Sequence, residues 1–234
     1  MPIEPTSLRD ALPPEFNFDR HGEIKTVVET KKEESPASWR QFRPAWRALP
    51  LRLAWAIQHD LAFTDSILRA GSAPPWPERY IQDREAFAFF ISGVSAIEVA
   101  CYSVYAVCSI ASPPYFPIRL RRDLRRISPE STDERLKHAF PNDTLSDCIH
   151  GICTDNVFTE WKRVRNSLIH HCAPARTIHA SLGAPEQEDD LWNHPEFTIR
   201  LNANTTQSRC RWLMTAVNNV ETHLLAFVQA HLRI

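Results

Sequence analysis

Glycine is scarce in this sequence, with 5 residues among 234, against 18 prolines. An all-β protein built from many tight turns needs glycine where the backbone takes positive φ, so this scarcity argues against such a fold. The prolines fall mostly between apolar segments, where they would separate helices. Hydrophobic residues make up 43% of the chain, which is ordinary for a globular protein with a buried core. The composition therefore predicts a mainly α-helical protein of one or two domains.

Several enzyme signatures are also missing. The chain contains no GxxxxGK[ST], GxGxxG, GxSxG or HExxH motif, which argues against the enzyme classes that those motifs mark. Neither sign of charge dominates, because 27 Lys and Arg stand against 28 Asp and Glu. This balance excludes a globally basic nucleic-acid coat, but it leaves room for a local basic patch.

An apolar secretory stretch is missing from the N-terminal residues MPIEPTSLRDALPPEF, so we expect no secretion. Scattered cysteines in a chain of this size predict free thiols in a reducing cytoplasm. The six are Cys101, Cys108, Cys148, Cys153, Cys172 and Cys210. Six residues are candidate zinc ligands by type: Cys148, His150, Cys153, His170, His171 and Cys172. The C-x-H-x2-C spacing of the first three matches no standard zinc finger, and the ligand pairs are irregular. We therefore expect no metal and no cofactor.

A single long hydrophobic run covers residues 86–112, with Glu98 as its one charged residue. The run is long enough to cross a bilayer. A carboxylate at the centre of a bilayer is costly, and no second run accompanies this one. We therefore interpret it as the central helix of a soluble bundle, apolar on all sides, and expect no membrane partner.

Apolar residues at helical spacing predict several helices, and proline-rich segments separate them. The predicted helices cover residues 39–70, interrupted at Pro44 and Pro50; residues 78–111, straight or kinked near Gly93; residues 143–153; residues 157–172; and residues 207–232. Residues 1–37 are interpreted as an arm with a short extended piece at residues 23–30.

Short strands are predicted at residues 177–182 and 197–201, around an acidic loop at residues 186–190. The predicted fold class is mainly α, a helical bundle with a small β-hairpin near the C-terminal helix. We divide the chain into an N-terminal arm and helical extension, residues 1–75, and a helical bundle, residues 76–234.

The segment 157–172, VFTEWKRVRNSLIHHC, carries the most informative pattern. A helix turns about 100° per residue, so one stripe is apolar and is expected to face the core. It consists of Val157, Trp161, Val164 and Leu168. The opposite face holds Arg163, Asn166 and His170, with Arg165 and His171 on the two shoulders. Such a face can be merely solvated, but it lacks the Glu/Lys pairs that usually decorate exposed helices.

The six residues RNSLIH, from Arg165 to His170, follow the pattern Arg-x4-His with a polar residue directly after the arginine. This motif, together with the apolar helix that contains Glu98, resembles the HEPN superfamily over roughly residues 85–230. Members of that family are helical bundles, and many are metal-independent ribonucleases of toxin–antitoxin, abortive-infection and CRISPR systems. The resemblance implies catalytic roles for Arg165, Asn166 and His170, in a cleft that two protomers share.

Metal-free RNA cleavage needs a base for the 2′-OH proton and an acid for the leaving 5′-oxygen, and histidine serves either role near neutral pH. A guanidinium suits the extra negative charge of the transition state. On an ideal helix Arg165 and His170 lie about 140° apart, so the site depends on a second copy. The expected partners are RNA, an identical chain, and an antitoxin or other regulatory protein.

Two further features accompany the motif. Residues 119–126 contain Arg119, Arg121, Arg122, Arg125 and Arg126, which would either hold RNA phosphates or pair with the acidic residues at 130–134. Glu98 is either buried, in which case it needs a cationic partner such as Arg165 or His170, or a solvent-facing residue on an otherwise covered helix. Arg163 and His171 are supporting candidates at the site. Two alternatives stay open: a HEPN-like module that binds or scaffolds without catalysis, and a helical structural protein in which the motif is coincidental.

Overall fold

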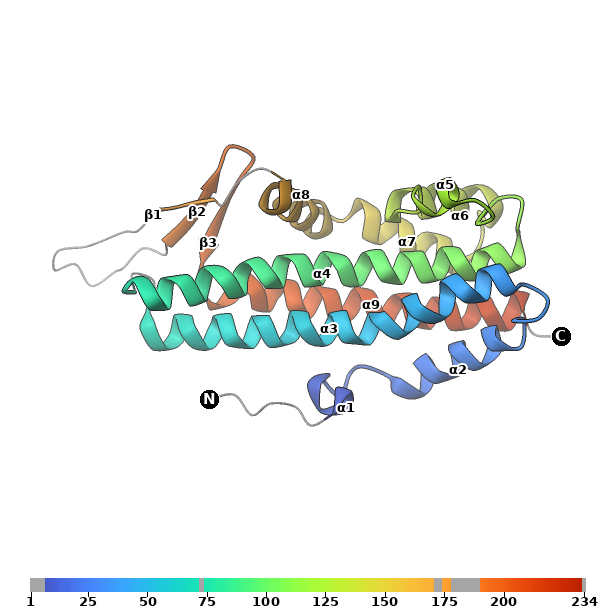
Figure 1. The fold of residues 1–234 in the computed structure, drawn as a ribbon, viewed down its shortest axis with the longest axis horizontal. Helices are drawn as coiled ribbons and strands as arrows, with labels where there is room; N and C mark the ends of the chain where they lie inside the picture. Colours follow the sequence, from blue (N-terminus) through green and yellow to red (C-terminus); the bar gives the residue numbers. More distant parts are fainter. Residues whose placement is uncertain (1–6, 72–73, 171–173, 178–189, 233–234) are drawn as a thin grey trace.

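The protein is mainly α-helical, as predicted (Figure 1). The computed structural model describes residues 7–71, 74–170, 174–177 and 190–232. Three long helices lie side by side and form the body of the molecule: α3 (Pro36–Ala70), α4 (Trp76–Ala111) and α9 (Ala203–His231). Shorter helices surround them: α1 (Leu8–Ala11), α2 (Phe18–Glu29), α5 (Arg121–Leu124), α6 (Pro129–Ala139), α7 (Thr144–Thr154) and α8 (Asn156–His170).

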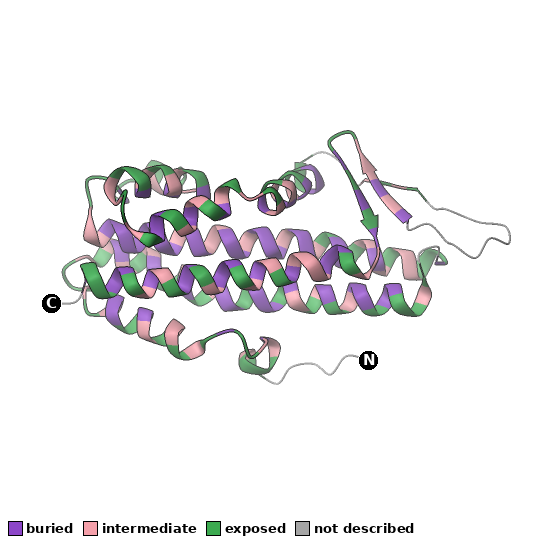
Figure 2. Ribbon diagram, turned by 180° about the vertical axis from the view of Figure 1, so that it is seen from behind, coloured by how far each residue is buried: buried purple, intermediate pink, exposed green. Residues whose placement is uncertain are grey.

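The core is continuous from the first helices to the last. Figure 2 shows buried positions along the long helices, and these belong to one hydrophobic cluster that extends from Leu12 to Leu232. Residues of both predicted parts of the chain, 1–75 and 76–234, contribute to it. The division at residue 75 stays a prediction.

Helix α4 occupies the centre of the bundle. It is the one helix, among the residues that the structure describes, that is long and apolar enough to cross a membrane, and 61% of its most apolar stretch is buried. Its neighbours are α3, α6, α8 and α9. Burial by protein on several sides accounts for its lack of an apolar stripe and fits the predicted role as the central helix.

Helix α3 runs through Pro44 and Pro50 without a break, so the predicted interruptions are wrong. Each proline removes one backbone hydrogen bond from the helix. The side chains of Phe42, Trp46 and Leu49 are nevertheless buried in the core. Packing along α4 and α9 therefore holds α3 together where local propensity would end it.

Residues 23–30 are not extended, because residues 23–29 belong to α2. The Asn17 side chain accepts a hydrogen bond from Arg20 N at 2.9 Å and caps the helix. Ile24, Val27 and Val28 are buried, at the three- and four-residue spacing of one helix face. The β-branched residues of this segment misled the sequence interpretation, because their burial against the bundle outweighs their strand preference.

A salt-bridged clamp joins α2 to α9. Glu221 on α9 is fully buried, and its Oε1 lies 2.8 Å from His21 Nδ1 while its Oε2 lies 3.6 Å from Arg20 Nε. Arg20 also donates hydrogen bonds to Asn218 and Thr222. The contacts of Arg20 and His21 offset part of the cost of burying the Glu221 carboxylate, whose Oε2 has no hydrogen-bond partner among the described residues.

The β-structure is a three-stranded antiparallel sheet in the order β1 (Ala175–Thr177), β2 (Asp190–His194) and β3 (Phe197–Leu201). The predicted strand at residues 197–201 is confirmed. Of the predicted strand 177–182, only Thr177 lies within the described residues. The acidic loop 186–190 also lies outside them, except for Asp190, which begins β2 and is buried.

Arg176 anchors the sheet to α4. Its Nε donates to Asp190 Oδ2 at 2.7 Å, and its Nη2 donates to Gln82 Oε1 at 2.7 Å. Trp192 adds a hydrogen bond from Nε1 to Asp83 Oδ1 at 2.9 Å. Because Asp190 is fully buried, its contact with Arg176 is shielded from solvent and joins β1 to β2. The hydrogen bonds to Gln82 and Asp83 hold the sheet against the first turns of α4.

Candidate functional site

Helix α8, which carries the RNSLIH motif, begins at a polar cap. Asp155 Oδ1 accepts a hydrogen bond from Val157 N at 2.7 Å, and Trp212 Nε1 donates to Asp155 Oδ2 at 3.0 Å. The predicted apolar stripe faces the core: Trp161, Val164 and Leu168 are buried, and Val157 is half-buried. The periodicity therefore fixed the orientation of the helix correctly.

Trp161 determines how closely α8 approaches α4. Its indole Nε1 donates to Phe90 O at 2.9 Å, and its ring stacks on Phe89 with 5.0 Å between ring centroids. A Cβ atom placed on Gly93 would lie 1.9 Å from Trp161 Cζ2. Glycine at this position is thus required by the ring above it, and α4 continues through Gly93 as an α-helix.

Three further contacts hold the flanks of α8. Arg165 Nη2 is hydrogen-bonded to Glu98 Oε1 on α4. Ser167 Oγ donates to Glu196 Oε2 at 2.7 Å, in the turn between β2 and β3. Arg209 Nη2 on α9 donates to Glu160 Oε1 at 2.9 Å. These anchors leave the solvent-facing side of α8 as its free face.

The free face of α8 carries Arg163, Asn166 and His170, all exposed, as the helical spacing predicts. No ion pair or hydrogen bond engages their side chains within the described part of the chain. His170 is the last residue of α8. The supporting candidate His171 lies outside the described residues.

Of the two candidate partners of Glu98, Arg165 and His170, the structure pairs Glu98 with Arg165, and the Glu98 carboxylate is partly exposed and not buried. The Arg165 side chain is 18% exposed and that of Glu98 is 41% exposed. Arg165 therefore points toward α4, while His170 faces solvent. One copy of the chain does not bring the guanidinium and the imidazole together, which agrees with their angular separation on the helix.

A cavity of about 430 Å³ adjoins this ion pair. Its walls come from α3, α4 and the start of α6: Ala45, Arg52, Ser95, Glu98, Val99, Tyr102, Ile127, Ser128 and Pro129. Arg52 donates from Nη1 to Ser95 Oγ at 2.5 Å, and its buried Nε has no hydrogen-bond partner among the described residues. The sequence interpretation missed Arg52. In the sequence Arg52 stands out as an arginine between apolar neighbours. That it lines the same cavity as Glu98 depends on how α3 packs against α4.

The arginine-rich segment 119–126 lies on the surface, and all five of its arginines are exposed. Two acidic residues of the 130–134 stretch have other partners: Glu130 pairs with Lys162, and Asp133 with Lys137 and His150. The ion pair of this segment, Arg122 with its neighbour Asp123, is long at 3.9 Å. The guanidinium groups therefore remain accessible to solvent and to anions.

Metal ligation has no support among the described residues, since no group of three or more His, Cys, Asp or Glu is placed to hold an ion. The five described cysteines are free thiols. Burial raises the pKa of Cys148 to about 11 and that of Cys153 to about 12, so both thiols stay protonated near neutral pH. Cys172 lies outside the described residues.

Comparison of the chain with protein-family models, curated proteins and solved structures gave no match. The likeness to the HEPN superfamily therefore depends on residues 165–170 and on the apolar helix that contains Glu98. This likeness is a hypothesis, and substitution of the exposed residues of α8 can test it.

Proposed function

We propose that this protein is a metal-independent endoribonuclease of HEPN type, active as a homodimer. The observation that carries the proposal is the free face of α8, where an imidazole, an amide and a guanidinium are exposed on one side of the helix and have no hydrogen bond or ion pair with the described residues. Asn166, His170 and Arg163 provide the groups that RNA cleavage needs, on a helix anchored on its other sides. A rigid support of this kind favours catalysis because positioning lowers the entropic part of the barrier.

In the proposed reaction the 2′-oxygen attacks the adjacent phosphorus, and the bond from phosphorus to the 5′-oxygen breaks. One His170 takes the 2′-OH proton, and the His170 of a second copy gives a proton to the leaving 5′-oxygen. Arginine side chains stabilise the charge that develops on the phosphate. The products are a 2′,3′-cyclic phosphate and a free 5′-OH, and DNA is not cut because it lacks the nucleophile.

The second copy supplies what one chain lacks. Arg165 is held by Glu98, so the accessible positive charge on the free face of α8 comes from Arg163. Two α8 helices packed with these faces toward each other would bring two imidazoles and two accessible guanidinium groups, one Arg163 from each copy, to one groove. We place this activity in the cytoplasm, as a toxin or antiviral effector restrained by an antitoxin or another regulatory protein.

A second candidate function is a binding module without catalysis, and one observation favours it. The ion pair between Glu98 and Arg165 neutralises the arginine of the motif within each protomer. A face that keeps only one accessible guanidinium is suited to holding a partner protein or a nucleotide. This candidate predicts partner binding without RNA turnover.

The deciding experiment is RNA cleavage in EDTA by the wild type and by His170→Ala. We expect cleavage by the substituted protein to fall by at least about 100-fold, because general acid–base catalysis contributes on that scale. His138→Ala is the matched control, since His138 is exposed on α6, and it should cut at the wild-type rate. The wild type should leave 2′,3′-cyclic phosphate ends. Equal cutting by wild type and His170→Ala would contradict the catalytic proposal, and no cutting by either would favour the binding module.

A further inference from the structure

The first two thirds of α3 carry an excess of positive charge, although the chain as a whole is nearly neutral. Residues 36–59 contain four arginines and no aspartate or glutamate, whereas the full chain is nearly neutral. Arg40, Arg43 and Arg47 are exposed, and among the described residues no ion pair or hydrogen bond engages their side chains. Like charges three and four residues apart on a helix repel each other, and a bound anion would relieve this repulsion.

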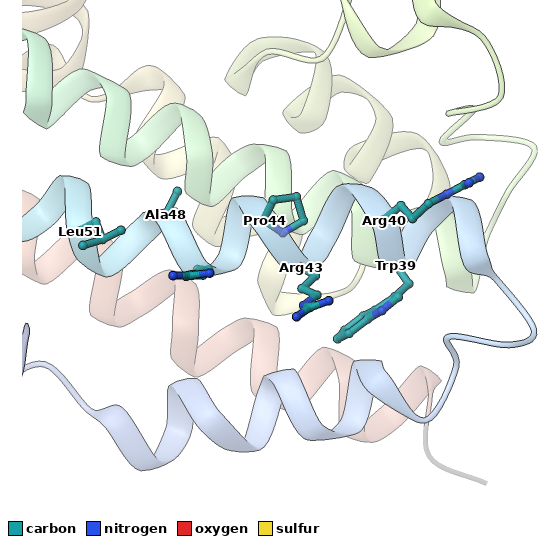
Figure 3. A pocket seen from close by; sticks show the side chains of 7 residues that line it. Trp39, Arg40, Arg43, Pro44, Ala48 and Leu51 are labelled. Atoms are coloured by element: carbon teal, nitrogen blue, oxygen red, sulfur yellow. The ribbon is translucent and has the colours of Figure 1, made fainter.

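These arginines border a surface groove of about 470 Å³, which we call the α3 arginine face. Its lining residues are Trp39, Arg40, Arg43, Pro44, Arg47, Ala48 and Leu51. In Figure 3 the Trp39 ring and the Arg43 side chain extend to one side of α3, and Arg40 extends to the other. The core-facing side chains of α3, such as Phe42 and Trp46, are buried on the opposite side of the helix.

The spacing of the arginines fits a repeating anion. At 1.5 Å of rise per residue, steps of three and four residues place Arg40, Arg43 and Arg47 about 5 Å apart along the helix axis. Apolar surface flanks them, since Leu51 is exposed at 37% and Trp55, one turn further along, at 48%. Guanidinium groups beside accessible aromatic rings are the combination that binds single-stranded nucleic acid through phosphates and stacked bases.

We propose that the α3 arginine face binds single-stranded RNA. The choice of RNA over DNA rests on the proposed function. Binding itself requires no cleavage, because the face lies on α3 and contains no residue of α8. An anionic membrane fits less well, because arginines occupy the centre of the face, where a membrane-bound helix carries its apolar residues. An acidic protein segment would offer the charge without bases to stack on Trp55.

The test compares two charge-matched triple variants in the His170→Ala protein. One carries Arg40→Gln, Arg43→Gln and Arg47→Gln. The control carries Lys32→Gln, Arg200→Gln and Arg211→Gln, which removes the same charge from exposed positions outside the α3 arginine face. Binding of a fluorescent single-stranded RNA is followed by anisotropy at several salt concentrations, and thermal melting verifies that each variant is folded.

The α3 variant should bind RNA at least about tenfold more weakly than the control. Its slope of log affinity against log salt should be smaller by about 2, because each lost phosphate contact removes roughly 0.7 from the slope for single strands. Equal affinities and slopes in the two folded variants would overturn the inference. The inference would also be overturned if the protein bound polyglutamate or phosphatidylserine vesicles more tightly than RNA, and if only the α3 variant lost that binding.

The two proposals fail separately. A wild type that binds RNA through α3 but never cuts it would refute the proposed nuclease and leave the α3 arginine face standing. Cleavage that depends on His170, together with unchanged RNA binding by the α3 variant, would support the nuclease and refute RNA binding by the α3 arginine face.

Discussion

Asp60 is a buried carboxyl group between α3 and α9, and it illustrates how one side chain affects the stability of the whole. It is 8% exposed, and its Oδ1 lacks a hydrogen-bond partner within the described residues. Burial raises its pKa above the ordinary 3.8, while Thr206 and Cys210 lower it to a smaller extent. Burial in the folded protein therefore disfavours the charged form of Asp60 relative to the unfolded chain.

This preference sets the sign of a pH effect. Because the folded-state pKa is the higher one, the contribution of Asp60 to stability is most favourable in acid and is lost as the pH rises through the folded-state pKa. Asp60→Asn replaces the carboxylate by a neutral group of similar shape. We expect this variant to be more stable than the wild type at pH 7 to 8, with a difference in Tm that shrinks toward pH 4. Thermal melting across this range tests it, and a lower Tm for the variant at neutral pH would contradict it.

At the scale of elements, the contact between α4 and α8 depends on the absence of a side chain at Gly93. The ring of Trp161 occupies the space that a Cβ would need. Gly93→Ala should therefore destabilise the fold by about 1–3 kcal/mol, the usual cost of overpacking a core. Denaturant unfolding measures this change. The Gly93→Ala substitution should also displace α8 and weaken any activity that depends on His170.

A matched control exists on α2. A Cβ at Gly22 would meet no atom within 4 Å, and this glycine also lies within a helix. Gly22→Ala should stabilise the protein by roughly 0.5–1 kcal/mol, because alanine loses less backbone entropy on folding. If both glycine variants proved equally stable, the close contact between residue 93 and the Trp161 ring would not cause the expected loss of folding free energy.

The elements also show what the sequence predicted and what it did not. The stripe at Trp161, Val164 and Leu168 is periodic over a whole helix, so its burial followed from spacing alone. A cationic partner for Glu98 was expected from its place in an apolar helix, but the choice of Arg165 over His170 depends on how α8 packs on α4. Strand β2 escaped prediction because its placement depends on contacts with distant residues of α4, such as that between Trp192 and Asp83.

At the scale of the whole molecule, the proposed activity requires two chains. A stable interface between them would bury about 800 Å² on each protomer. The protein should then have twice its monomer mass of 26.9 kDa in solution, as measured by light scattering. Cleavage per protomer should decline on dilution, since dissociation separates the two His170 side chains. RNA cutting by a protein that stays monomeric at every concentration would be inconsistent with a shared site.

The clamp between α2 and α9 has a practical consequence for the design of shortened versions of the protein. A fragment beginning at Pro36 would lose Arg20 and His21, and the Glu221 carboxylate would be left on α9 without them. The apolar surface beneath Ile24 and Val28 would become exposed to water at the same time. Expression trials should accordingly retain residues 17–30, because trimming them would favour aggregation over a smaller soluble unit.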